Sequence, residues 1–261
     1  MSESAGNNRL VWAVAVPAVL VAGLLVISMR ARRELQHEPA FSVDPAQVSL
    51  VGRPAWMPEA VAGALAADVS AHVAAGASLL SEDELVSLAR TVAEASPWIE
   101  SVERVEPRWP AQAEIHIHVR QPVLAVGDVL VAANGRPLGL GPVTLDPAPL
   151  RCTGKLTGED LAECAAAAAA ILPYRKDLLA QGVRIAEVAA GAGDSVSFIT
   201  EGAVELAWGR SPRRSPLAYL DVPLEGRLAN LQQVLKDHPG LQGLQRVQLW
   251  TDRPVVVLRD G

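Results

Sequence analysis

Hydrophobic and polar residues alternate strictly over residues 114–120, where isoleucine, isoleucine and valine are separated by charged residues and histidines. A period of two is typical of a strand that has one face in a core and the other in water. The preceding stretch from Trp98 to Val105 is also rich in β-forming residues. The dipeptide Trp109-Pro110 lies between the two stretches. The pattern therefore predicts two neighbouring strands joined at a short corner.

The region before these strands carries one further strand pattern and two helical patterns. Residues 41–52 are rich in β-formers and end on a glycine, and residues 58–73 are alanine-rich. Ser81 to Glu84 predict a capping box, in which the Ser hydroxyl and the Glu carboxylate satisfy backbone donors at a helix start. Apolar residues then recur at helical spacing until Pro97 ends the helix: Leu85, Leu88, Ala89 and Val92. Residues 41–123 therefore predict a strand, helix, helix, strand, strand order.

The region after residue 123 combines strand patterns with two helices. An alanine-rich helix is predicted over residues 159–172, and leucines spaced four, three and four apart predict a second helix over 224–235. Strands are predicted at 129–132, before an Asn-Gly hairpin signal, and at 183–188, 195–200, 203–208, 244–250 and 255–258. Because the helices are separated from what reads as an antiparallel meander, the fold class is α+β with a mostly antiparallel second domain.

Residues 10–29 are twenty consecutive residues without a charge. As a helix they would measure about 30 Å, the thickness of the hydrocarbon layer of a bilayer. A cleaved signal peptide has a shorter apolar stretch, and no cleavage site follows; a buried core helix is the other alternative. We therefore expect a retained transmembrane helix. Three arginines after residue 29, against Arg9 before it, favour a cytoplasmic body, although large domains are translocated largely regardless of such charges.

The predicted organisation follows from these patterns. It consists of a cytoplasmic tail over 1–9, a transmembrane helix over 10–29, a juxtamembrane linker over 30–40, a first domain over 41–123 and a second domain over 124–261.

Composition and charge exclude some classes of protein. The chain of 261 residues has a net charge of −6, which provides no basic surface for nucleic acid. Aromatic residues make up only 4%, so the cores must consist mainly of Ala, Val and Leu. Cys152 and Cys164 are the only cysteines. Their even number is compatible with a disulfide in an oxidising compartment and equally with two buried thiols.

Motifs of catalysis do not occur in the sequence. There is no nucleophile elbow, phosphate-binding loop, dinucleotide fingerprint or zinc-protease motif, so we expect no enzyme, no cofactor and no metal site. His116 and His118 share one face of a predicted strand, but two imidazoles without a third ligand fit a solvated strand face better than a metal site. Pro254 precedes the last predicted strand, and proline is confined to sheet edges, strand starts or bulges. The C-terminal strand is therefore expected at an edge, where its free N–H and C=O groups could accept a partner strand.

The order of these patterns resembles the POTRA module and the β domain of the bacterial cell-division proteins FtsQ and DivIB. The POTRA pattern is matched by Val48 to Gly52, by Pro97-Trp98-Ile99 with Val102 and Val105, by Arg108-Trp109-Pro110 and by Val119 to Pro122. The β-domain pattern is matched by VLVAANGRPLG at 129–139, VELAWGR at 204–210, GRLANLQQVL at 226–235 and LQRVQLWTDRPVVV at 244–257. Gln248-Leu249-Trp250 departs from the family, which has an acidic-Leu-Arg triplet there.

The resemblance implies a single-pass inner-membrane scaffold of the divisome, with its bulk in the periplasm at the division septum. Its implied partners are FtsB-like and FtsL-like membrane proteins and, indirectly, the septal peptidoglycan synthase. In the family the final strand receives the FtsB-like partner by strand addition, which here implies the partner-binding residues Val247, Leu249, Trp250, Arg253, Val255, Val256, Val257 and Leu258. The alternatives are a POTRA-containing component of protein secretion or outer-membrane assembly, and a membrane-anchored hydrolase.

Overall fold

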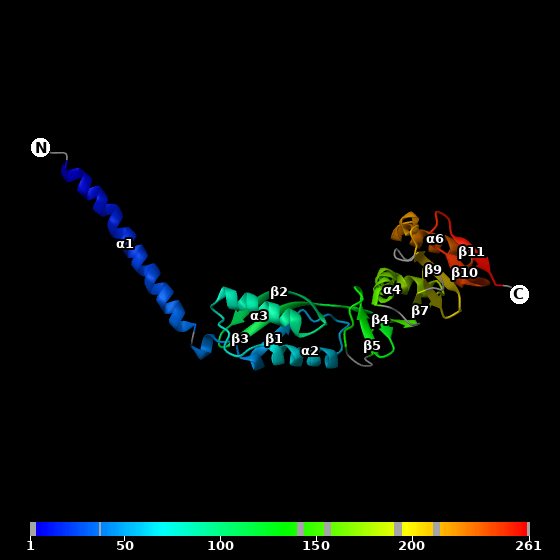
Figure 1. Cartoon of the computed structure of the whole chain (residues 1–261), viewed down its shortest axis with the longest axis horizontal. Coiled ribbons are helices and arrows are strands. Elements are labelled where there is room, and N and C mark those ends of the chain that lie inside the picture. The colour runs from blue at the N-terminus through cyan, green and yellow to red at the C-terminus, as the bar shows by residue number, and fades with distance from the viewer. Residues whose placement is uncertain are drawn as a thin grey trace. The chain divides into compact units, whose positions relative to one another are not determined.

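The chain has an α+β fold and divides into two compact units (Figure 1). The computed structural model describes residues 4–36, 38–139, 144–153, 158–190, 195–210 and 215–259, with side chains from residue 17 onward. The first unit comprises Met1–Arg53 and Gly63–His118, and the second comprises Pro54–Ala62 and Val119–Gly261.

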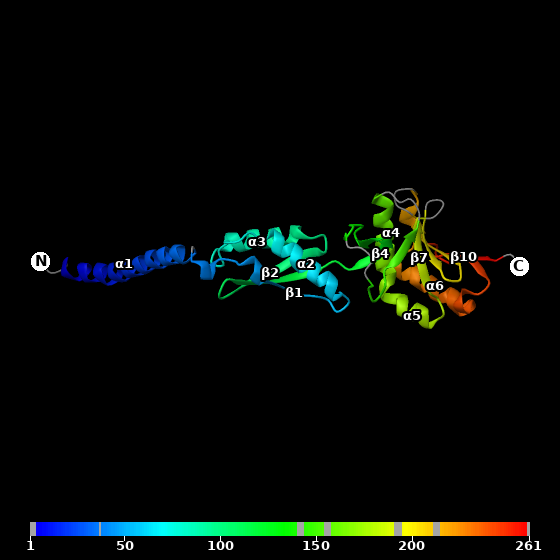
Figure 2. The ribbon, with the colours of Figure 1, turned by 90° about the horizontal axis from the view of Figure 1, so that it is seen from below.

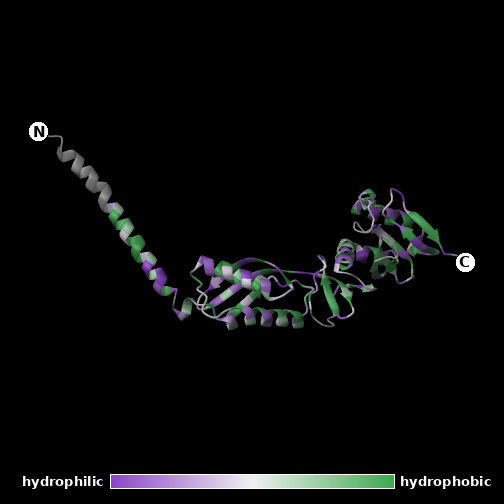
Figure 3. Ribbon diagram, in the orientation of Figure 1, coloured by the Kyte–Doolittle hydropathy of each residue, from purple (hydrophilic) through white to green (hydrophobic). Residues whose placement is uncertain are grey.

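Helix α1 (Ser4–Leu35) contains the stretch for which a membrane span was predicted. Its described side chains begin at Pro17, and the uncharged stretch ends at Met29, before Arg30, Arg32 and Arg33 (Figure 3). Among the residues that the structure describes, no helix is long and apolar enough to cross a membrane. This finding contradicts the predicted transmembrane helix at 10–29 and the expected single-pass, inner-membrane location with a periplasmic body.

The first unit has the predicted order of elements. Strand β1 (Val48–Val51) is followed by helices α2 (Glu59–His72) and α3 (Glu82–Ala95) and by strands β2 (Ile99–Arg108) and β3 (Gln112–Val119). The sheet order is β1-β3-β2, with β1 parallel to β3. The alternation over 114–120 is confirmed, because Ile115 and Ile117 are buried and His118 is exposed. Trp109, at the corner between β2 and β3, is 73% exposed.

The start of α3 differs in one detail from the predicted capping box. The Ser81 hydroxyl accepts a hydrogen bond from the Glu84 backbone N–H at 3.4 Å, as expected of an N-cap. The Glu84 carboxylate accepts from the backbone N–H of Ser78, so it fixes the segment before the helix. Leu88 and Val92 then face the core.

The second unit contains one sheet of eight strands with three helices (Figures 1 and 2). The strand order is β11-β10-β9-β8-β7-β6-β4-β5. The strands are β4 (Pro122–Val126), β5 (Val129–Ala132), β6 (Leu150–Thr153), β7 (Ile185–Ala190), β8 (Ser195–Thr200), β9 (Glu205–Arg210), β10 (Leu244–Gln248) and β11 (Val255–Leu258). The helices are α4 (Gly158–Ile171), α5 (Arg175–Ala180) and α6 (Leu224–Asp237).

The sheet of the second unit is more mixed than predicted. The meander β7-β8-β9 is antiparallel, but β4–β6, β6–β7 and β9–β10 are parallel pairs. A parallel pair needs a crossover connection, and the helices provide two of them: α4 and α5 connect β6 to β7, and α6 connects β9 to β10. The prediction of helices separated from the strands was therefore wrong for this unit.

One row of paired apolar residues crosses all eight strands. Each member lies opposite the next in the strand register or two residues away on the same face, and the row consists of Val131, Leu124, Leu150, Cys152, Val188, Phe198, Leu206, Val247 and Val256. Residues of α4 and α6, including Ile171 and Leu231, belong to the same core cluster. The helices therefore cover the face of the sheet that carries this row.

We predict that Gly52→Ala strongly destabilises the first unit. Gly52 follows β1 with a φ of 106°, and an added Cβ would overlap the backbone carbonyl of Ile117. The substitution should lower the free energy of unfolding by at least about 2 kcal/mol. Gly63→Ala in helix α2 is the control, because no atom lies within 4 Å of its added Cβ, and it should stabilise by about 0.5–1 kcal/mol. Urea unfolding followed by circular dichroism measures both; equal effects would contradict the prediction.

Candidate functional site at the C-terminal edge of the sheet

Strand β11 forms one edge of the eight-stranded sheet. It pairs with β10 on one side in an antiparallel register that places Val255 opposite Gln248, Val256 opposite Val247 and Val257 opposite Arg246. Within the part of the chain that the structure describes, no strand pairs with its other side. A row of backbone donors and acceptors is therefore open along this edge.

Two backbone hydrogen bonds identify the residues whose backbone groups face outward. The Leu249 N–H donates to the Ala207 carbonyl of β9 at 3.0 Å, so by alternation Arg246 and Gln248 direct their backbone groups toward β11. The Arg259 N–H donates to the Gly243 carbonyl at 2.9 Å, which directs Val255 and Val257 toward β10. The N–H and C=O groups of Val256 and Leu258 consequently face away from the sheet. Pro254 has the same orientation and has no N–H to offer.

The side chains of β11 are all apolar and mostly exposed. Val255, Val257 and Leu258 are 46%, 41% and 62% exposed, whereas Val256 is partly buried against the core. Figure 3 shows the hydrophobic colour along the whole strand. Natural sheet edges are usually protected by charges, bulges or a covering segment. An uncharged apolar edge is therefore a candidate interaction surface.

The connection between β10 and β11 is fixed by helix α6 and by the segment before it. The side-chain amide of Asn230 on α6 donates to the carbonyls of Leu249 at 3.0 Å and Thr251 at 2.7 Å. The backbone N–H of Val222 donates to the Trp250 carbonyl at 2.9 Å. Asn230 was not identified from the sequence, although its spacing of four from Val234 places it on the buried helix face, where a polar residue needs a partner.

The structure brings the predicted partner-binding residues together in one hairpin, but not on one surface. Val247 and Leu249 have exposures of 0% and are core residues, so they cannot contact a partner directly. Trp250 is half-buried and Arg253 is exposed in the turn. The remaining four lie on the edge strand itself: Val255, Val256, Val257 and Leu258.

Cys152 and Cys164 are both buried, and both are free thiols in the structure. Cys152 lies on β6 and Cys164 on α4, so they face each other between sheet and helix. A hydrogen bond from the Cys164 thiol lowers the pKa of Cys152. The same hydrogen bond, with burial, raises the pKa of Cys164. The Cys164 thiol is thereby held in its protonated, donor form.

The residues best placed to hold a metal ion lie in the first unit and are Glu106, Glu114 and His116. Their ligand atoms lie within 4.8 Å of one another. Both carboxylates are already paired with guanidinium groups: Arg104 lies 2.6 Å from Glu106, and Arg108 lies 2.9 Å from Glu114. The hydrogen bond from Arg104 lowers the pKa of Glu106. The two guanidinium groups therefore balance the charge of the two carboxylates on this strand face.

Comparison of the sequence with protein-family models and with curated proteins gave no match.

We predict that Asn230→Ala loosens the turn that carries Trp250. The variant leaves the carbonyls of Leu249 and Thr251 without their donor, and should lower the free energy of unfolding by about 1–3 kcal/mol. Hydrogen exchange should become faster over residues 249–258. Gln233→Ala is the control, because Gln233 lies on the same helix and its amide bonds only to the exposed Asp237. If the two variants had the same stability and exchange, Asn230 would not support the edge.

Proposed function

We propose that this chain is a cell-division scaffold of the FtsQ/DivIB type, which binds another division protein by strand addition to β11. In this proposal the protein is not an enzyme. It binds an FtsB-like partner together with an FtsL-like protein and through them recruits or regulates septal peptidoglycan synthesis. The observation that carries the proposal is the open, uncharged edge of β11 in a sheet that follows a β-α-α-β-β unit.

Two of the other sheet edges, β2 and β5, are less suited to a partner strand. Strand β2 carries five charged residues at its open edge, Glu100, Glu103, Arg104, Glu106 and Arg108, and charges of this kind prevent edge pairing. The outer side of β5 is covered by the segment that follows it: the Ala132 N–H donates to the Arg136 carbonyl at 3.0 Å and the Leu138 N–H to the Leu130 carbonyl at 2.8 Å. The choice of β11 over β1 follows from the family resemblance.

The apolar row across the sheet gives an energetic reason for strand addition. Val256 is the last member of the row, and it is only partly buried; among the described residues no further strand pairs beyond β11. An apolar residue of a partner strand opposite Val256 would extend the row by one position and cover this side chain. The outward N–H and C=O groups of Val256 and Leu258 would at the same time obtain partners. Main-chain hydrogen bonds then provide affinity and the side-chain row provides register.

Trp250 and Arg253 have a different role in this proposal. Both lie in the turn that enters β11, outside the ladder. A half-buried tryptophan beside a binding edge is a typical anchor for a partner side chain. Arg253 is exposed and can pair with an acidic group of the partner. Val247 and Leu249 support the edge from the core and do not contact the partner.

We predict that Val256→Pro abolishes partner binding while the fold is retained. Proline removes only an outward N–H at this position, so the pairing of β10 with β11 is preserved. Its ring also obstructs the approach of another strand. The dissociation constant for a purified complex of FtsB-like and FtsL-like proteins should increase at least about tenfold. Val256→Ile keeps the N–H and an apolar branched side chain, and should bind nearly as well as the wild type.

We predict in addition that Trp250→Ala abolishes co-purification with the FtsB-like partner. The matched control is Trp109→Ala, which removes the 73% exposed tryptophan of the first unit. Co-purification should be lost in the first variant and kept in the second, with thermal unfolding as a check on the fold of both. Unchanged binding of Val256→Pro and Trp250→Ala would refute the assignment of the edge.

A further inference from the structure

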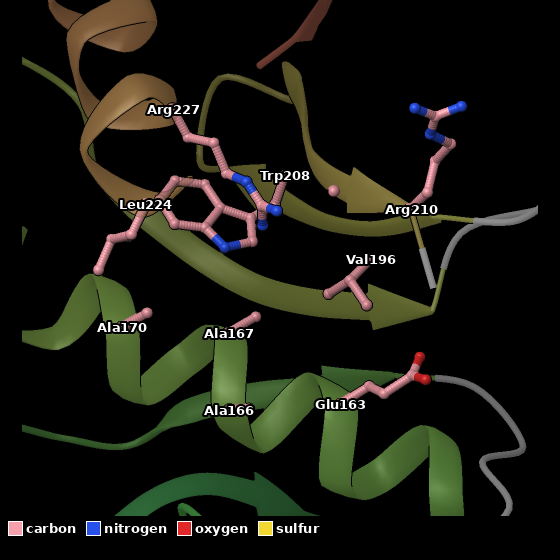
Figure 4. A pocket seen from close by; sticks show the side chains of 10 residues that line it. Glu163, Ala166, Ala167, Ala170, Val196, Trp208, Arg210, Leu224 and Arg227 are labelled. Carbon is pink, nitrogen blue, oxygen red and sulfur yellow. The ribbon is translucent and has the colours of Figure 1, made fainter. Parts of the chain in front are cut away.

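A cavity of about 370 Å³ lies in the second unit between α4, the strands β8 and β9 and the start of α6 (Figure 4). Its apolar lining comes from small or branched side chains: Ala167, Ala170, Val196 and Leu224. Its polar lining includes Trp208 of β9 and Arg227 of α6. The volume is near the lower end of that of small-ligand sites, so the cavity suits a short group rather than a long one.

Trp208 places an unused hydrogen-bond donor in this cavity. The residue is 4% exposed, and its ring packs edge-on against Phe198 with the ring centroids 5.2 Å apart. Figure 4 shows the indole nitrogen on the side of the ring that faces Ala167, inside the cavity. Its contacts within the described chain are the ring contacts with Phe198 and Arg227, neither of which is a hydrogen bond from Nε1. Indole N–H is a donor only, and Nε1 is not among the fully buried unpartnered atoms of the described chain, so a ligand in the cavity can reach it.

Arg227 adds a second donor, and it carries a charge. Its guanidinium carbon lies 5.9 Å from the centroid of the Trp208 ring, and its Nε donates to the Val222 carbonyl at 2.9 Å. The space that it occupies exists because residue 209 is glycine: an added Cβ would lie 2.6 Å from Arg227 Nη1. Burial lowers the pKa of Arg227, because the charged guanidinium loses solvation by water. A bound anion would replace part of that lost solvation.

The carboxylates near the cavity leave this charge only partly balanced. Asp221 is bound mainly to Arg210, whose Nε lies 2.6 Å from one carboxylate oxygen and whose backbone N–H lies 2.7 Å from the other. Arg227 is farther from Asp221, at 3.9 Å. Figure 4 shows the carboxylate of Glu163 pointing away from Trp208 and Arg227. The first turn of α6, which begins at Leu224, adds the partial positive charge of a helix N-terminus.

We infer that this cavity binds a carboxylate attached to a small aliphatic group, as at the C-terminus of a peptide that ends in leucine or valine. The carboxylate would accept from the indole N–H of Trp208 and from the guanidinium of Arg227. The aliphatic group would contact Ala167, Ala170 and Leu224. An acidic side chain next to an apolar residue has the same chemistry. The inference does not depend on strand addition to β11, because no residue is common to the two sites.

The test is a titration of the ¹⁵N-labelled full-length chain with N-acetyl-Ala-Leu, followed through the indole N–H resonances. The free-acid peptide should shift the Trp208 resonance in a saturable way, with a dissociation constant on the order of 1 mM. The corresponding C-terminal amide should bind at least about tenfold more weakly, because it lacks the charge. A third peptide, N-acetyl-Ala-Glu-Leu-amide, distinguishes the sources: binding equal to that of the acid shows that side-chain carboxylates are accepted, and weak binding restricts the site to C-termini.

Three variants locate the site and one controls for charge. Trp208→Phe removes the donor and keeps an aromatic ring, Arg227→Gln removes the charge, and Gly209→Ala displaces the guanidinium. Each should weaken binding of the free acid at least about fivefold. Arg184→Gln is the control, because Arg184 is exposed and pairs with Glu201 outside the cavity, and it should bind as the wild type does.

Several results would overturn the inference. Equal affinity for the acid and the amide would show that no carboxylate is recognised. The absence of a shift in the Trp208 resonance up to about 10 mM peptide would show that the cavity takes no such group. If Trp208→Phe fails to fold, the comparison of acid and amide on the wild-type chain still decides. Loss of binding at the β11 edge in Val256→Pro leaves this titration unchanged, so the two proposals fail separately.

Discussion

The row of apolar side chains that crosses the sheet is the constraint on which the second unit depends. Strand pairing alone does not determine register, but a slip by one residue would turn a buried row toward solvent on every strand. The row runs from Val131 to Val247 fully covered by helices and neighbouring strands, and it ends at Val256, which is only partly covered. The row that stabilises the sheet therefore ends at the edge strand β11 with an apolar side chain, Val256, that is only partly covered. The stability of the sheet and the proposed strand addition therefore rest on the same pattern.

Much of the first unit was readable from the sequence because its signals are local. Alternation identified β3, and the cap at Ser81 with Pro97 delimited α3. In the second unit β8 and β11 were predicted with their observed bounds, 195–200 and 255–258. Strand β6 was missed, because a four-residue strand after a proline-rich passage has no period to detect. The parallel pairs were missed because parallel and antiparallel strands carry similar local patterns, and only the crossover through a helix decides between them.

The candidate site was predictable as a segment but not as a surface. Residues 247–258 were predicted as one segment, yet Val247 and Leu249 are buried, because Val247 belongs to the core-facing row of the interior strand β10 and Leu249, two residues on, packs in the same core cluster. Which residues of a hairpin face outward depends on the strand that pairs with it, and that strand, β9, is 41 residues away in sequence, as in the pair Arg246 and Glu205. The cavity at Trp208 gave no sequence signal at all. Its lining comes from four elements that are far apart in the sequence. No local pattern around a tryptophan or an arginine indicates that these elements will come together.

One residue, Val222, is hydrogen-bonded both to the hairpin turn and to a side chain that lines the tryptophan cavity. Its amide is held by the carbonyl of Trp250, and its carbonyl is held by the guanidinium of Arg227. Val222 is therefore clamped on both sides, by a residue of each region. A ligand that displaced the Arg227 guanidinium would act on the Val222 carbonyl and, through Val222, on the segment that contacts Trp250. The cavity and the turn that carries Trp250 are therefore connected through the backbone of Val222.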